Sequence, residues 1–236
     1  MGKNKKSASR ITKTEKYLSL FPDDEKSNAE RKRFQALKEA QDVRKFEIDL
    51  YWKRTGFFWA FITIIYTAFF HVLCKYIEYP GKYALFVPVI SALSGLGFFF
   101  SVAWHMVNKG SKFWQENWEK HVSLLEKSEI GPLYDVFLNP KGTIRERLCP
   151  IKAFDFSVTK VNMWASFTIC ICSFCGLVGI IYWIIKYKNA CPVLSIAPGA
   201  IIVVFSILLL VFSDGNKDIE VSPELEEPEL NMIYRH

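Results

Sequence analysis

The sequence predicts an all-α membrane protein whose four transmembrane helices form two hairpins with juxtamembrane cytoplasmic helices, assembled as a homo-oligomer. Half of the residues are hydrophobic although 23% are charged, so the two kinds of residue must occupy separate stretches of the chain. A helix needs about 20 apolar residues to cross a bilayer. Four runs of that length lack Asp, Glu, Lys and Arg: residues 55–74, 83–107, 161–185 and 190–213.

Lysine and arginine are distributed very unevenly between the segments that connect these runs. There are 15 before residue 55 and 9 in residues 108–160, but only 2 in each of the links 75–82 and 186–189. Because cytoplasmic segments carry the excess of Lys and Arg, the basic segments and both chain ends are predicted to be cytoplasmic. The predicted divisions are a basic arm and amphipathic helix (1–54), a first hairpin (55–107), a cytoplasmic helical segment (108–160), a second hairpin (161–213) and an acidic tail (214–236).

The first segment begins with a polar, lysine-rich arm, residues 1–14, which we expect to be disordered and to lie near anionic lipid. Nucleic-acid binding is disfavoured because the arm lacks interleaved aromatic residues. Ser27 and Glu30 resemble a capping box that opens a helix. In that helix Phe34 and Phe46 share an apolar face, which we expect to pack on the central segment or on a neighbouring subunit. A helix lying on the membrane surface is the alternative.

Trp52, Lys53 and Arg54 directly precede the first hairpin, and this combination is typical of the cytoplasmic interface of a membrane. No Asp or Glu occurs in any of the four runs, so His71 is interpreted as an interfacial side chain and not as part of a proton relay. On the second run Gly95 and Gly97 each lie four residues from a serine. Such small pairs allow helix backbones to approach closely, and they predict tight packing within a bundle or between subunits.

The central segment carries a second amphipathic face, formed by Trp114, Trp118, His121 and Leu125 at helical spacing. Two tryptophans can bury about 150–250 Å² each, so this face is predicted to need a partner. The natural partner is the face that carries Phe34, from the same chain or the next. A metal site is disfavoured because no second His or Cys stands at ligand spacing, and no cofactor is expected.

The second hairpin repeats the small pairs, with Gly176 and Gly179 as further packing candidates. Cys74 and Cys191 are both predicted at outer ends of spans, where a disulfide is conceivable but spacing alone does not decide it. The acidic tail is expected to be disordered and able to reach basic segments of the protein or a soluble cytoplasmic partner.

Four stretches resemble the RipA family of small bacterial inner-membrane proteins. They are FEIDLYWKR (46–54), SKFWQENWEKHVSLLE (111–126), GPLY (131–134) and FSVTKVN (156–162). The resemblance leaves the arm and the tail uncovered. It implies an octamer in the cytoplasmic membrane of a bacterium, and it transfers no catalytic residue.

The leading functional hypothesis is a non-enzymatic homo-oligomer of the inner membrane that serves as a cytoplasm-facing scaffold or sensor platform. Walker loops, nucleophile elbows and HExxH motifs are absent from the sequence, so no enzyme class is predicted. The alternative is a pore-forming or membrane-perturbing effector opened by a cytoplasmic trigger. The runs lack a ring of charged residues typical of ion conduction, although Ser, Thr and Gly faces are compatible with a gate.

Overall fold

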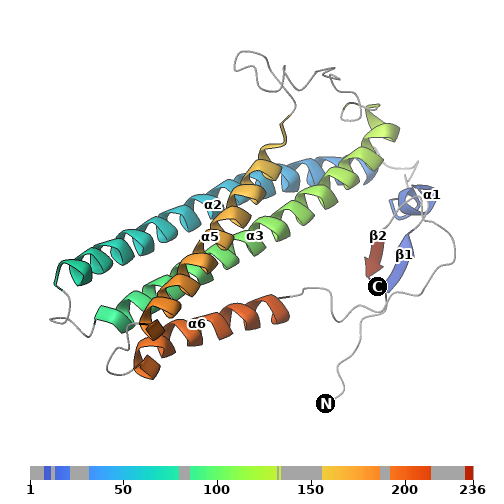
Figure 1. Cartoon of the computed structure of the whole chain (residues 1–236). Coiled ribbons are helices and arrows are strands. Elements are labelled where there is room, and N and C mark those ends of the chain that lie inside the picture. Colours follow the sequence, from blue (N-terminus) through green and yellow to red (C-terminus); the bar gives the residue numbers. More distant parts are fainter. Residues whose placement is uncertain are drawn as a thin grey trace, which may run out of the picture. The chain divides into compact units, whose positions relative to one another are not determined.

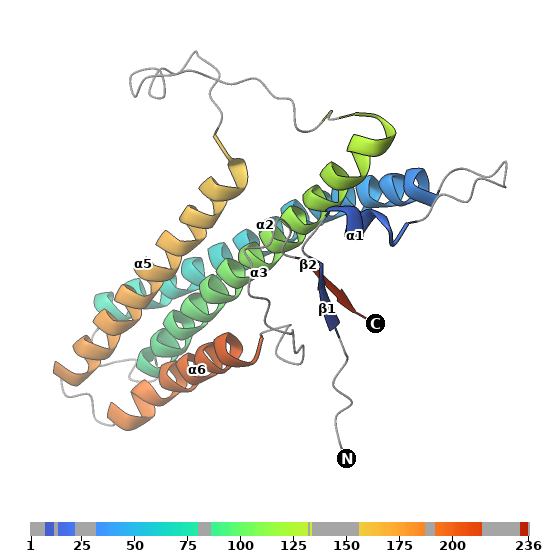
Figure 2. The same cartoon turned by 90° about the vertical axis from the view of Figure 1, so that its right-hand side faces the viewer.

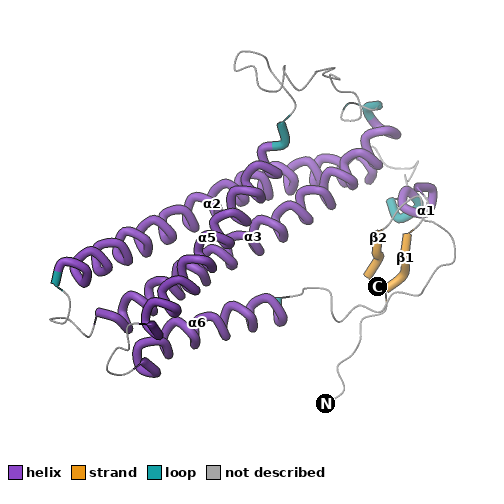
Figure 3. The backbone as a smooth tube through the Cα atoms, viewed as in Figure 1, coloured by secondary structure: helices purple, strands orange, loops and turns teal. Residues whose placement is uncertain are grey.

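The protein is built almost entirely from helices, as Figure 1 and the purple segments of Figure 3 show. A computed structural model describes residues 8–11, 14–21, 32–79, 86–131, 133, 156–186, 192–213 and 232–235. The order of elements is β1 (Ala8–Ile11), α1 (Thr14–Leu18), α2 (Lys32–Glu78), α3 (Phe86–Glu129), α5 (Val158–Lys186), α6 (Pro192–Phe212) and β2 (Met232–Arg235). The predicted helical fold is therefore confirmed in its main part.

Helices α2 and α3 are much longer than a membrane span. They have 47 and 44 residues, and at about 1.5 Å per residue each extends roughly twice the thickness of the hydrocarbon core. The amphipathic helix predicted around Phe34 continues without a break into the first apolar run, as the sequence suggested. The capping box of Ser27 and Glu30 lies outside the described residues.

Helix α3 ends where the sequence predicts a stop. Gly131 has φ of +85°, and its N–H donates to the carbonyl of Glu126, which also accepts from Ile130. A glycine in this left-handed conformation is a common helix terminator because a Cβ would be strained there.

Three helices are long and apolar enough to cross a membrane: α2, α3 and α5. Helix α6 is a shorter apolar helix and contains Pro198 within its length. In both Figure 1 and Figure 2, α6 lies beside the amino-terminal part of α3 and the carboxy-terminal part of α5.

The chain divides into two compact units. We call one the membrane unit (Asp49–Phe113 and Lys141–Ser213), which contains the apolar runs, and the other the terminal unit (Met1–Ile48, Trp114–Pro140 and Asp214–His236), which contains both ends of the chain.

Within the terminal unit, β1 and β2 form a two-stranded antiparallel sheet, with Ala8 opposite Arg235 and Ile11 opposite Met232. The expectation that the arm and the tail are disordered is therefore wrong for these two segments. Each contributes β-branched or aromatic residues that favour strands. The two strands lie more than 200 residues apart in the sequence, so no local pattern predicts the pairing.

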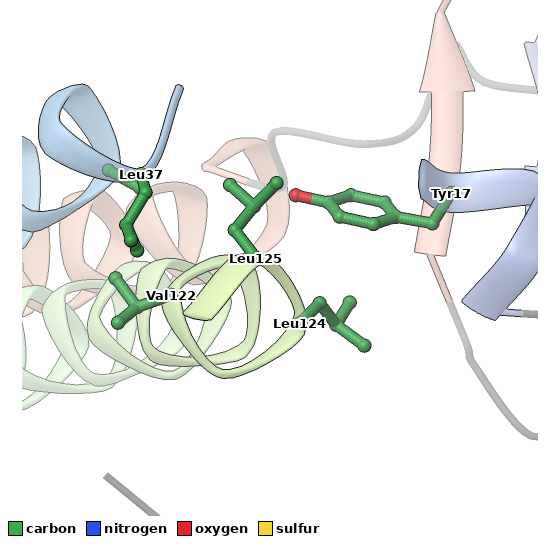
Figure 4. Close-up of a cluster of buried hydrophobic side chains, with 6 residues drawn as sticks. Tyr17, Leu37, Val122, Leu124 and Leu125 are labelled. Atoms are coloured by element: carbon green, nitrogen blue, oxygen red, sulfur yellow. The ribbon is translucent and has the colours of Figure 1, made fainter. Parts of the chain in front are cut away.

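The core of the terminal unit is a hydrophobic cluster that joins α1 to the ends of α2 and α3. Figure 4 shows Tyr17 of α1 pointing toward Leu125, with Leu37 of α2 and Val122 of α3 beside it. Tyr17 and Leu125 are each 1% exposed. The sequence predicted contact between the α2 and α3 faces, and the structure adds α1 as a third component.

Candidate functional site: a polar spine in the membrane unit

Buried polar side chains form a stripe along α3. Ser94, Ser101 and Asn108 follow one another at seven-residue intervals, and Ser91 and Ser111 extend the stripe in each direction. All five are buried although the helix around them is apolar. A seven-residue repeat keeps these side chains on one face, so the stripe faces the helices that pack on α3.

Asn162 of α5 is the centre of the hydrogen bonding at one end of this stripe. Its Nδ2 donates to the Tyr51 hydroxyl at 2.5 Å, and it lies 3.4 Å from both Thr55 Oγ1 and Asn108 Oδ1. The contacts therefore join α2, α3 and α5 at a single level. At this level, the Nδ2 atom of Asn108 is a donor that has no hydrogen-bond partner among the described residues.

Further along the bundle, hydroxyl groups form a second connection between the same three helices. The Tyr66 hydroxyl donates to Ser173 Oγ at 2.5 Å, and Ser173 Oγ lies 3.0 Å from Ser101 Oγ. Ser173 Oγ donates its proton to the Ile169 carbonyl one turn earlier in α5, so the single proton of Ser101 is shared between Ser173 Oγ and the Gly97 carbonyl. Between the two levels, His105 Nδ1 lies 3.0 Å from Ser166 Oγ and thereby joins α3 to α5.

We refer to these linked groups as the polar spine, consisting of Tyr51, Thr55, Tyr66, Ser101, His105, Asn108, Asn162, Ser166 and Ser173. Buried polar groups that lack hydrogen bonds are costly in an apolar medium. In the spine the groups bond mainly to one another and to helix carbonyls, so the arrangement fixes the register of the three helices. In chemical terms it is a structural network of hydroxyls, amides and one imidazole.

Glycines on α3 and α6 bring helices close together in the membrane unit. A Cβ placed on Gly95 would lie 3.1 Å from Gly199 Cα, and one placed on Gly97 would lie 2.8 Å from the Tyr66 ring. These two predicted packing residues therefore make contacts within one chain. By contrast, a Cβ on Gly176 or Gly179 of α5 would meet nothing within 4 Å.

In the terminal unit, Tyr17 contacts the predicted amphipathic face of α3. The Tyr17 hydroxyl and His121 Nδ1 are 2.6 Å apart, and the His121 ring lies 5.2 Å from that of Trp118. Burial lowers the pKa of His121, because the charged imidazolium is poorly solvated there, and burial raises the pKa of Tyr17. A neutral imidazole can accept the Tyr17 hydrogen bond, so both shifts favour this contact.

The remaining residues of the predicted faces are less buried. Phe34 is half-buried and its ring lies 4.7 Å from Lys38 Nζ, whereas Phe46 and Trp114 are 59% and 47% exposed. The full burial expected for both faces is therefore not reached within one chain. A contact of Phe46 with another subunit stays a prediction. Cys74 is exposed, and its suggested partner Cys191 lies outside the described residues.

Sequence reasoning missed the spine residues Tyr51, Tyr66, Asn108 and Asn162. Two signals were available: Asn108 and Asn162 each stand at the edge of an apolar run, and Tyr66 is a hydroxyl-bearing side chain in the middle of one. Amide and hydroxyl groups in membrane helices commonly bond across helices. Local spacing, however, gives no indication of which helices supply the partners.

Long apolar helices joined by buried interhelical hydrogen bonds define a helical membrane protein. The chain belongs to the octameric membrane protein family (8xMP), whose family model matches residues 34–184. The match extends from the amphipathic part of α2 into the end of α5, and it confirms the resemblance that the motifs between Phe46 and Asn162 indicated. No curated protein and no solved structure matches the chain.

Proposed function

We propose that the protein is a non-enzymatic homo-oligomer, an octamer, that spans a bacterial inner membrane four times and serves as a cytoplasm-facing scaffold or sensor platform. The observation that carries the proposal is the match to a family described as octameric membrane proteins, which covers all three long apolar helices. Helix α6 supplies the fourth crossing, because its 21 residues are about 30 Å long.

The exposed surface of α5 supports assembly. Trp164, Ile171, Val178 and Ile185 recur every seven residues on this helix and are all exposed in the single chain. Gly176 and Gly179 are open for close approach of another helix. Polar groups of the spine are already bonded inside the chain, so contacts between subunits would depend on apolar and small side chains.

The first experiment measures the mass of the full-length protein in lipid nanodiscs, and we expect eight copies. The proposal would be refuted if the measured mass were that of a monomer at a protein concentration at which crosslinking occurs in native membranes. Gly176→Leu with Gly179→Leu should lower the subunit number. Gly56→Leu is the matched control, because a Cβ on Gly56 also meets nothing within 4 Å but lies on α2.

The scaffold role places the terminal unit and both chain ends in the cytoplasm. The distribution of Lys and Arg supports this topology, with 24 of 30 before residue 55 or in residues 108–160. A protease added outside intact spheroplasts should leave the acidic tail intact. Trimming of the tail would show that it lies outside the cell membrane, which would contradict the proposed topology.

A pore is the second candidate, favoured by one feature of α5. Thr168, Cys172 and Cys175 share an exposed face with Gly176, and small or polar side chains of this kind can line a path between subunits. Purified protein in voltage-clamped bilayers separates the two functions: a scaffold gives no reproducible conductance, whereas a pore does.

A further inference from the structure

Helices α2 and α5 run parallel to one another, and the contacts between them fix their relative heights. In three of these contacts the residue of α5 has a number 107 higher than the residue of α2. They are Thr55 with Asn162, Tyr66 with Ser173, and Tyr76 with Trp183. A residue in this part of α2 is therefore level with the α5 residue whose number is 107 higher, and one residue corresponds to about 1.5 Å along either helix.

Helix α2 carries a row of projecting side chains on its outer surface, which we call the large row. Its members are Phe57, Ile64 and His71, which recur every seven residues and therefore share one face. All three are exposed in the single chain, and Phe57 and Ile64 are 66% and 65% exposed. Most of the surface of this row is thus available to another molecule.

Helix α5 carries a matching row of small residues, which we call the small row. Its members are Ala165, Cys172 and Gly179, which also recur every seven residues and are also exposed. A Cβ placed on Gly179 would meet nothing within 4 Å. Each member lies one residue, or about 1.5 Å, from the height of a member of the large row. The resulting pairs are Phe57 with Ala165, Ile64 with Cys172, and His71 with Gly179.

The two rows have the properties that a ring of subunits requires. In a ring, one face of each copy contacts a different face of the next copy. Rotation about an axis perpendicular to the membrane leaves every residue at its height, so rows that are level within one chain are also level between neighbouring copies. Large side chains opposite small ones at seven-residue spacing allow knobs-into-holes packing of parallel helices, and small residues allow membrane helices to approach closely.

We propose that the large row of one copy packs into the small row of the next copy, and that this contact closes the ring. The occupant is a second copy because the chain belongs to a family described as octameric, and because a lipid chain does not require matched heights. The inference rests on the octamer of the proposed function and adds the faces through which it assembles. Gly56, the control position used above, is turned about 100° from Phe57 around α2 and lies outside the contact.

The first test is disulfide formation between two full-length chains that carry different tags and are produced together. One chain has Ile64→Cys and lacks all six native cysteines, and the other keeps Cys172 alone. Oxidation with copper phenanthroline in native membranes should give a linked dimer that contains one chain of each kind. Each chain produced alone should give no linked dimer. Linked dimers of identical chains would show that like faces meet, and they would overturn the proposal.

Thr63→Cys is the matched control for Ile64→Cys. Thr63 is also exposed and lies within about 1.5 Å of the same height, but it is turned about 100° around α2. It should form no link to Cys172. Equal linking from the two positions would mean that the helices collide without a defined face, and the assigned contact would be wrong.

A size exchange tests the same contact without oxidation. Cys172→Leu fills the space that Ile64 of the neighbouring copy should occupy, so the eight-copy species should be lost in lipid nanodiscs. Adding Ile64→Ala should restore that species, which a general loss of stability would not allow. The proposal is wrong if Cys172→Leu alone still gives eight copies, or if the second change restores nothing.

The mass of the wild type in the same nanodiscs separates this inference from the octamer itself. Eight copies of the wild type without a link between Ile64→Cys and Cys172 would leave the octamer standing and remove this interface. A linked dimer of the two chains together with a different copy number would do the reverse.

Discussion

Replacing Asn162 by leucine tests whether the polar spine stabilises the helical bundle. The two side chains have the same number of heavy atoms and the same branching at Cγ, and leucine is the bulkier of the two, so the change removes hydrogen bonds without leaving a cavity. It removes a donor that lies 2.5 Å from the Tyr51 hydroxyl, together with two longer contacts of 3.4 Å to Thr55 and Asn108. An interhelical hydrogen bond in a membrane protein contributes about 0.6–2 kcal/mol, and a buried polar group left without a partner costs about 1–3 kcal/mol.

We therefore expect Asn162→Leu to lower the free energy of unfolding by about 2 kcal/mol. The assay is unfolding in mixed micelles by titration with dodecyl sulfate, followed by far-ultraviolet circular dichroism. Thr168→Val is the matched control on the same helix, because the exposed Thr168 hydroxyl bonds to the carbonyl of Trp164 within α5. It should change the free energy by less than about 0.5 kcal/mol.

A double-mutant cycle with Tyr51→Phe isolates the short hydrogen bond. The two changes should be non-additive by about 1 kcal/mol, since each removes one side of the same contact. Equal effects of Asn162→Leu and Thr168→Val, or strict additivity with Tyr51→Phe, would refute the reasoning that the spine holds the three helices together.

Three other changes have outcomes that the structure specifies. Gly199→Ala should destabilise the membrane unit by about 1–3 kcal/mol, because the new Cβ would lie 3.0 Å from the Ser91 carbonyl oxygen; Gly176→Ala, which meets nothing within 4 Å, should be neutral in the same micelle titration. Leu125→Ala should cost about 2–5 kcal/mol, since Leu125 is 1% exposed, and hydrogen exchange should then increase in α1 and at the end of α3 but not in α5. Docking of Tyr17 should depend on pH. The pKa of His121 is lowered in the folded protein, so the unfolded state binds more protons below about 6.5, and the stabilisation present above that pH is lost as the pH falls. Protection of the α1 amides should decrease from pH 7.5 to 5 in the wild type and become insensitive to pH in His121→Gln; the opposite slope would contradict the assigned protonation.

The long helices were predictable because their signals are local. Apolar length, flanking charge and small residues such as Gly95 are properties of short windows, and they give the positions of α2, α3, α5 and α6 to within a few residues. The helix stop at Gly131 is local for the same reason.

The spine and the terminal unit were less predictable because they depend on distant pairs. Asn162 gains its partners from helices 54 to 111 residues away, and Tyr17 meets His121 across 104 residues. Amphipathic spacing correctly indicated that the face around Leu125 is buried. It did not indicate that a five-residue helix near the start of the chain would provide part of the cover.

The polar spine also has a consequence for the order of biogenesis. Because its hydroxyls and amides are bonded largely within one chain, a newly inserted copy can shield most of its own hydrogen-bonding groups from acyl chains before it meets another copy. We therefore expect folding of the individual chain to precede its assembly, so that single copies accumulate as compact, protease-resistant species when synthesis is too low for them to encounter one another.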